Sequence, residues 1–215
     1  MTALTLHYSP GACSLASHIA LEEAGADFEP RRVDFAAAEQ RSPAYLAMNP
    51  KGRVPVLVHG DFVLTENPAI LRYAARLNPT AGLWPEDMGA EARCAEWLAW
   101  CASGLHPSYA HIRRPERYAE SAAAKEDVVA KGRNATREIW EAVERRLAGS
   151  AAPWAAGDAY SVADPYVFTF WTWGRGPVLG YDMASDFPAW TAHARRMAER
   201  PAVRAVLARE GLPPV

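Results

Sequence analysis

The chain has 215 residues, which is enough for one large domain or two smaller ones with a hydrophobic core. Half of its residues are hydrophobic and 22% are charged, and its net charge of −2 argues against a nucleic-acid-binding protein. It contains no apolar run long enough to cross a bilayer, and its start lacks the basic and apolar segments of a signal peptide. These features predict a cytoplasmic protein that binds neither nucleic acid nor membrane.

The N-terminal part alternates strand and helix signals, which predicts a small α/β domain. Strands are expected at Leu4–Tyr8, Phe28–Asp34, Val54–Val58 and Phe62–Leu64, and helices at Ser14–Ala24, Pro43–Met48 and Pro68–Leu77. The strand–helix–strand start favours a parallel pair with a right-handed crossover. The sequence His59-Gly60-Asp61 between the last two strands is a hairpin signal.

The C-terminal part carries helix signals almost throughout. The stretch Asn78–Asp87 is rich in Pro, Gly and Asp, which break helices, so we interpret it as the connection between two domains. Helices are expected at Glu91–Ser108, Ala119–Leu147, Val162–Leu179, Ala189–Arg200 and Ala202–Arg209. We therefore expect an α/β domain over residues 1–80, a linker over 81–88 and an all-helical domain over 89–215.

Three cysteines are present, and this odd, sparse count does not indicate a disulfide framework. Cys94 and Cys101 are seven residues apart in a predicted helix, and we interpret them as buried thiols. Cys13 differs because it lies in the tight turn between the first strand and the first helix. The N–H groups of a helix start favour a thiolate, so Cys13 is either a functional thiol with a lowered pKa or a small packed side chain. The hydroxyls of Tyr8, Ser9 and Ser14 are possible donors to a sulfur there.

Two further segments could bind a ligand. Pro55 leaves Val54 extended, so the backbone of Val54 could pair with an extended peptide, although an edge-strand proline is the simpler interpretation. Glu66 and Asn67 stand at a helix start before Pro68. They could cap that helix, or they could bind the ammonium and the carboxylate of a ligand.

Taken together, the segments YSPGACSLASHIAL, NPKGRVPVL, LTENPAIL and SVADPYVFT resemble the glutathione transferases, and the first resembles the bacterial beta class closely. The resemblance covers nearly the whole chain. It implies an α/β thioredoxin-like N-terminal domain followed by an all-α helical C-terminal domain. It also implies a homodimer, for which the helix with Trp97 and Trp100 could supply an interface, and a cis bond before Pro55.

The resemblance also implies a site for glutathione as co-substrate, with no permanently bound cofactor. Val54 would pair with the cysteinyl part of glutathione, and Glu66 with Asn67 would hold its γ-glutamyl end. Cys13 and His106 would lie beside the glutathione sulfur as catalytic residues. The residues expected to line the electrophile pocket are Tyr109, His111 and Arg113.

Several positions depart from the family pattern. No lysine occurs in the stretch Phe35–Glu39, where the beta class often has one for the glycyl carboxylate, and Pro107, Ala99 and Asn67 replace polar residues common in the family. Each change removes or alters a polar contact worth roughly 1 kcal/mol. Possible substitutes for the lost lysine are Lys51, Arg53, Arg31 and Arg32.

The leading hypothesis is a glutathione transferase that attacks a small apolar electrophile with the glutathione thiolate, with possible thiol transfer through Cys13. The alternative is a protein that keeps the fold but only binds a ligand or partner. A metal site is not expected, because His106 and His111 are five residues apart and no third ligand is evident. Trp171 and Trp173 are interpreted as core residues of the helical domain.

Overall fold

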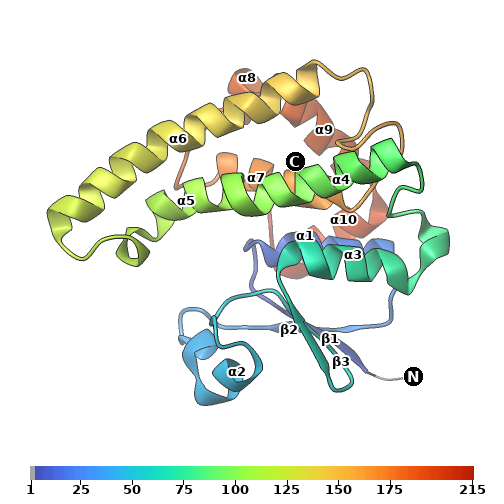
Figure 1. Cartoon of the computed structure of the whole chain (residues 1–215), viewed down its shortest axis with the longest axis horizontal. Coiled ribbons are helices and arrows are strands. Elements are labelled where there is room, and N and C mark those ends of the chain that lie inside the picture. Colours follow the sequence, from blue (N-terminus) through green and yellow to red (C-terminus); the bar gives the residue numbers. More distant parts are fainter. Residues whose placement is uncertain (1–2) are drawn as a thin grey trace.

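A computed structural model describes residues 3–215 of the chain. Met1 and Thr2, which open the predicted first domain, lie outside the described residues. Figure 1 shows a small sheet with its own helices next to a larger group of helices, with one long helix, α6, along the outer side. The predicted fold class is confirmed, whereas the boundaries of the two domains stay a prediction.

The sheet has four strands in the order β2-β1-β3-β4: β1 (Leu4–Tyr8), β2 (Glu29–Arg32), β3 (Val56–His59) and β4 (Phe62–Thr65). Strand β1 runs parallel to β2, as the sequence predicts, and antiparallel to β3, with Leu6 opposite Leu57. Both leucines are fully buried. Strands β3 and β4 form the predicted hairpin.

Helices cover both faces of this sheet. Helices α1 (Ser14–Glu23) and α3 (Asn67–Leu77) lie between the sheet and the helical domain, while η1 (Glu39–Arg41) and α2 (Pro43–Met48) lie on the other side (Figure 1). Every residue from Ser14 to Leu21 is buried, because α1 also packs against α7 (Ala163–Gly174) and α10 (Pro201–Glu210). One apolar core therefore runs through both domains.

The helices of the C-terminal part follow η2 (Pro79–Ala81) in the chain. The elements of this part are α4 (Met88–Trp100), the π-helical turn η3 (Cys101–Leu105), α5 (His106–Arg113), η4 (Pro115–Arg117), α6 (Ala122–Ala148), α7, α8 (Met183–Asp186), α9 (Pro188–Glu199) and α10. Helix α7 is central and almost wholly buried. Its start is fixed by Asp164, whose carboxylate accepts from the Ser161 N–H at 2.8 Å and bonds His193 at 2.9 Å.

Two helix predictions are wrong in detail. The helix expected to stop at Ser108 continues to Arg113 after a π-helical turn. The helix expected to reach Leu179 ends at Gly174, because Gly176 and Pro177 follow and do not continue a helix. No helix in residues 3–215 combines the length and apolar character needed to span a membrane.

Candidate functional site

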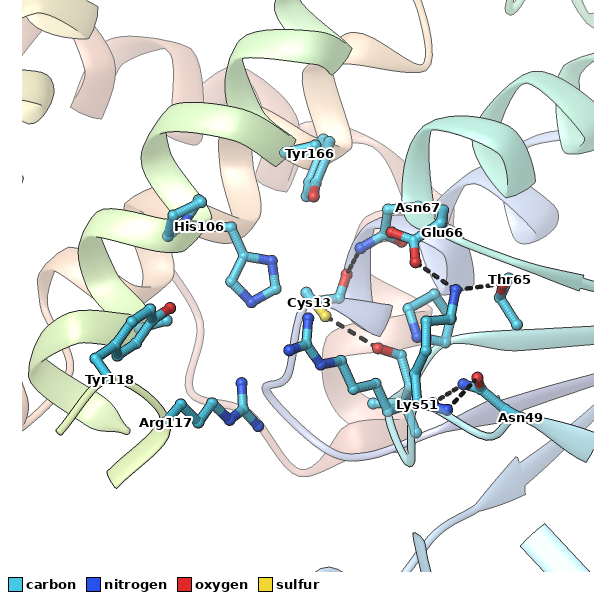
Figure 2. A pocket seen from close by; sticks show the side chains of 16 residues that line it. Cys13, Asn49, Lys51, Thr65, Glu66, Asn67, His106, Arg117, Tyr118 and Tyr166 are labelled. Atoms are coloured by element: carbon cyan, nitrogen blue, oxygen red, sulfur yellow. Dashed lines mark hydrogen bonds and ion pairs between the residues drawn. The ribbon is translucent and has the colours of Figure 1, made fainter. Parts of the chain in front are cut away.

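A pocket opens between the two domains, and it draws its walls from separated parts of the chain (Figure 2). The α/β domain contributes Cys13, Asn49, Lys51, Arg53, Val54, Pro55, Thr65, Glu66 and Asn67. The helical domain contributes Ala102, His106, Pro107, Ala110, Arg117, Tyr118 and Tyr166. The pocket therefore brings together the predicted residues Cys13, Val54, Glu66, Asn67 and His106.

Cys13 lies at the start of α1, as the sequence predicts, but the residue is buried, with 8% of its surface exposed. Its Sγ donates to the carbonyl of Val54 at 3.2 Å. Burial raises the pKa of Cys13 to about 12, and the Glu66 charge adds to this effect, whereas helix-start N–H groups and Arg53 oppose it. The expectation of a lowered pKa is therefore wrong, because loss of hydration outweighs the helix start here.

The hydroxyls expected to face the sulfur do not line the pocket. Ser14 Oγ accepts from the Ser9 N–H at 3.1 Å and donates to the Ser9 carbonyl at 3.2 Å, so these two residues stabilise the turn itself. The Tyr8 ring packs against His18, with ring centroids 4.8 Å apart. The assignment of Tyr8, Ser9 and Ser14 as donors to the sulfur is corrected accordingly.

The bond between Val54 and Pro55 is cis, as the resemblance implies. The preceding carbonyl, that of Arg53, accepts from the Tyr45 hydroxyl at 2.8 Å and from the Asn49 side-chain amide at 2.7 Å. These two bonds hold the loop on the α/β domain, with Val54 in the pocket wall.

Glu66 precedes α3 with a φ of 75°, a conformation that is unfavourable for a residue with a side chain and that is often retained at functional sites. Its carboxylate pairs with Lys51 Nζ, which also donates to Thr65 Oγ1 at 2.7 Å (Figure 2). The Asn67 side chain is occupied within the protein, because it donates to the Cys13 carbonyl at 2.8 Å and accepts from Ser17 Oγ at 2.6 Å.

His106 enters the pocket from the first residue of α5, immediately after η3. The His106 N–H donates to the Cys101 carbonyl, which is the wide hydrogen bond of a π-helical turn. Burial lowers the pKa of His106 to about 4, and the charges of Arg53 and Arg117 add to this effect. The imidazole is therefore neutral at pH 7. Figure 2 shows His106 and Tyr166 pointing from the helical domain toward Cys13.

The residues predicted to line an electrophile pocket lie outside the described lining. The Tyr109 ring packs on Trp173 with centroids 4.4 Å apart, His111 packs on Tyr118 at 4.2 Å, and Arg113 is exposed. These three residues were expected from the resemblance alone, which did not foresee the π-helical turn before α5. The helical wall includes Pro107, Ala110, Arg117 and Tyr118 instead.

Some pocket residues were not singled out from the sequence. Tyr166 is 2% exposed, and burial raises its pKa well above the ordinary value. It lies within SVADPYVFT, one of the segments that resemble the glutathione transferases, so the sequence held a signal that could have indicated it. Arg117 and Tyr118 come from an irregular connection that carries no such signal. Of the four cations considered for the missing lysine, Lys51 and Arg53 line the pocket, while Arg31 and Arg32 lie on β2 away from it.

The comparisons with known proteins agree with this arrangement. Residues 2–76 match the glutathione S-transferase N-terminal domain, and residues 104–201 match the glutathione S-transferase C-terminal domain. The chain belongs to the glutathione S-transferase family. Members of this family are transferases that use glutathione as a co-substrate.

Individual glutathione S-transferases match over almost their whole length. One from Xanthomonas campestris is 35% identical over 210 residues, which are 97% of this chain and 100% of the relative. The crystal structure of a Sulfitobacter glutathione transferase homologue with bound glutathione superimposes with a TM-score of 0.91 at 39% identity, covering 99% of this chain and 100% of that one. A bacterial beta-class enzyme from Sphingomonas chungbukensis gives 0.80 at 36% identity, covering 97% and 100%.

Proposed function

We propose that the pocket binds glutathione and directs its thiolate at a small electrophile held against the helical wall. The observation that carries this proposal is the convergence of Cys13, Val54, Glu66 and His106, from both domains, on one pocket. The glutathione bound in the Sulfitobacter homologue supports the choice of ligand.

In the proposed complex, the cysteinyl backbone of glutathione lies along Val54 as an added strand. Its γ-glutamyl ammonium meets the Glu66 carboxylate, and its α-carboxylate meets the N-terminus of α3, where unpaired N–H groups favour an anion. Glutathione then competes with two interactions of the free protein. These are the hydrogen bond from the Cys13 thiol to the Val54 carbonyl and the ion pair between Lys51 and Glu66.

Three donors would surround the glutathione sulfur. Because the pKa of Cys13 is raised to about 12, its thiol keeps the proton and donates to the glutathione thiolate. The neutral imidazole of His106 supplies an N–H, and the Tyr166 hydroxyl faces the same space (Figure 2). Hydrogen bonds to an anion are stronger in a dry site, so these groups favour ionised over neutral glutathione.

Thiol transfer through Cys13 is a second candidate, favoured by the position of Sγ in the pocket wall. In that reaction Cys13 would form a disulfide with glutathione, and the attacking group must be a thiolate. The raised pKa of Cys13 opposes its ionisation, so we rank conjugation first. A protein that binds without turnover is the remaining alternative, in keeping with the lost lysine and the occupied Glu66.

The test compares Cys13→Ser with Cys13→Ala. Serine keeps a donor beside the sulfur, so conjugation of 1-chloro-2,4-dinitrobenzene should change by only a few-fold, whereas alanine should lower kcat by about tenfold. Both substitutions should abolish thiol transfer. Equal conjugation by native protein and both variants would exclude a donor role for Cys13.

Glu66→Ala provides the binding arm of this test. Loss of a charge-assisted contact should weaken glutathione binding about tenfold or more in calorimetry. A matched control is Asp61→Ala, in the β3–β4 turn outside the pocket lining. Millimolar or weaker binding by the native protein, with no conjugation of any electrophile, would overturn the transferase proposal.

A homodimer and a cytoplasmic location are further proposals, which rest on the family resemblance. Trp97 does not serve as a dimer contact in this chain, because it is fully buried and donates to the Ala155 carbonyl. Sedimentation of the purified protein measures the oligomeric state directly.

A further inference from the structure

The side chains that line the pocket carry more positive than negative charge. Four lining residues carry full charges at neutral pH: Lys51, Arg53, Glu66 and Arg117. Glu66, the only carboxylate among the described lining residues, is paired with Lys51. The guanidinium groups of Arg53 and Arg117 make no hydrogen bond or ion pair with any other group in residues 3–215.

These two arginines approach the pocket from different domains. Arg53 precedes the Val54-Pro55 bond on the α/β side, and Arg117 ends η4 on the helical side, with its side chain directed into the pocket in Figure 2. Burial lowers the pKa of Arg117, and the positive charge of Arg53 adds to this effect. An anion that binds near two unpaired positive charges lowers their electrostatic repulsion, so such a pocket favours an anionic ligand.

Glutathione supplies an anion for only one of them. Its α-carboxylate is accounted for by the N-terminus of α3, which leaves the glycyl carboxylate. Arg53 adjoins the Val54 backbone that pairs with glutathione, so it is the nearer partner for that carboxylate. Arg117 lines the pocket from the helical side, next to Tyr118 in the chain, where no part of glutathione is expected.

We propose that Arg117 binds a carboxylate on the electrophile, so that the second substrate is a planar, anionic molecule rather than an apolar one. This inference rests on the proposed function. A guanidinium holds a carboxylate through two parallel hydrogen bonds, which fixes the orientation of the electrophile. The exposed ring of Tyr118, 46% accessible, offers a flat surface next to that contact.

The reaction with an aryl chloride illustrates the expected chemistry. The glutathione thiol releases its proton to solvent, and the thiolate sulfur forms a bond to the ring carbon that carries chlorine. The carbon–chlorine bond then breaks, and chloride leaves with the bonding electrons. The carboxylate of the electrophile takes no part in bond making and serves only for binding.

The test uses two matched electrophiles, 4-chloro-3-nitrobenzoate and the neutral 4-chloro-3-nitrobenzamide. Because the two differ in intrinsic reactivity, the quantity compared is the ratio of their kcat/KM values in each protein. Arg117→Gln should lower the benzoate-to-benzamide ratio about tenfold and leave the KM for glutathione unchanged. Arg114→Gln, at a neighbouring arginine that pairs with Glu116 outside the pocket lining, should leave the ratio unchanged.

An unchanged ratio in Arg117→Gln would overturn the inference, and so would a raised KM for glutathione, which would assign Arg117 to the glycyl carboxylate. If the native protein conjugates neither electrophile, activity with 1-chloro-2,4-dinitrobenzene tests the proposed function, and calorimetry with unreactive 3-nitrobenzoate decides the inference separately. Binding that is lost in Arg117→Gln supports it, and equal binding by both proteins overturns it.

Discussion

Cys13 and His106 face one pocket from different domains, and burial moves both toward their uncharged forms. The pKa of Cys13 is raised to about 12 and that of His106 is lowered to about 4. At neutral pH the site therefore holds a protonated thiol and a neutral imidazole, each able to donate a hydrogen bond. Such a pair stabilises an anion brought in by a ligand without adding a charge of its own.

The lowered pKa of His106 predicts a pH-dependent loss of stability. Between pH 6.5 and about 4 the unfolded imidazole is protonated while the folded one is not, so the unfolded state binds more protons and becomes favoured as the pH falls. From pH 7.5 to pH 5 this contribution lowers the free energy of unfolding by about 2 kcal/mol. The charged groups that act on His106 are Arg53, Arg117 and Glu66.

Urea unfolding of the native protein and of His106→Gln at both pH values measures this contribution. The variant should lose less stability on acidification, because it lacks the titrating imidazole. Equal losses in the two proteins would show that His106 titrates normally.

Among the elements, the π-helical turn η3 links buried residues of the helical domain, Cys101 and Leu105, to the pocket residue His106. It places His106 at the start of α5, whose Tyr109 and His111 lie outside the pocket lining. Gly104 lies within this turn, where an added Cβ would sit 2.8 Å from Trp100 Cδ1. The ring of Trp100 in turn packs near Trp97, with centroids 5.2 Å apart. The close approach at Gly104 thus helps to fix the geometry of the turn.

Gly104→Ala should therefore lower stability, despite the better helix propensity of alanine. The clash with Trp100 should cost about 1–3 kcal/mol, offset in part by the propensity gain of roughly 1 kcal/mol. Displacement of His106 should also lower kcat. Ser103→Ala, at an exposed position of the same turn, is the control and should change neither the urea midpoint nor kcat. A Gly104→Ala variant as active and stable as the native protein would contradict this account.

For the molecule as a whole, helix α10 holds the turn between β1 and α1 that carries Cys13. Glu210 at the end of α10 is 6% exposed; its Oε2 accepts from the Gly11 N–H at 2.9 Å and its Oε1 bonds His18 Nδ1 at 2.7 Å. Arg209 contacts His18 Nε2 at 3.1 Å. Because a guanidinium only donates, His18 accepts there and donates through Nδ1 to Glu210. Trp173 Nε1 donates to the Gly11 carbonyl at 2.8 Å, so both polar groups of Gly11 are bound by the helical domain.

Glu210→Ala should loosen the turn that carries Cys13. It leaves the Gly11 N–H and the His18 N–H without partners, which should cost about 2–5 kcal/mol of stability and raise the KM for glutathione. Glu210→Gln keeps one acceptor oxygen, so its stability and its KM for glutathione should lie between those of the native protein and those of Glu210→Ala. Glu199→Ala, at an exposed position of α9, is the matched control. A normal KM in Glu210→Ala, alongside lowered stability, would show that this contact supports the fold and not the site.

The sequence predicts most of the fold because its signals there are local. Each signal determines the conformation of only the residues next to it. Examples are the strand pattern of Leu4–Tyr8, the hairpin residues between β3 and β4, and the proline of Val54-Pro55. The state of Cys13 was not predictable, because its burial depends on contacts with segments distant in the sequence, such as the Val54 carbonyl. The pocket role of Arg117 was missed for a related reason, since the connection between α5 and α6 has no periodic pattern and its position is set by packing between domains.

The bond between Gly11 and Glu210 joins residues 199 positions apart. During synthesis, strand β1 and helix α1 leave the ribosome long before α10, so the turn between them lacks this partner until α10 has emerged. Contacts so distant along the chain also slow folding, because a long loop must close before they form. The turn that carries Cys13 is therefore complete only once α10 has packed against it, so a fully formed pocket requires the folding of both domains.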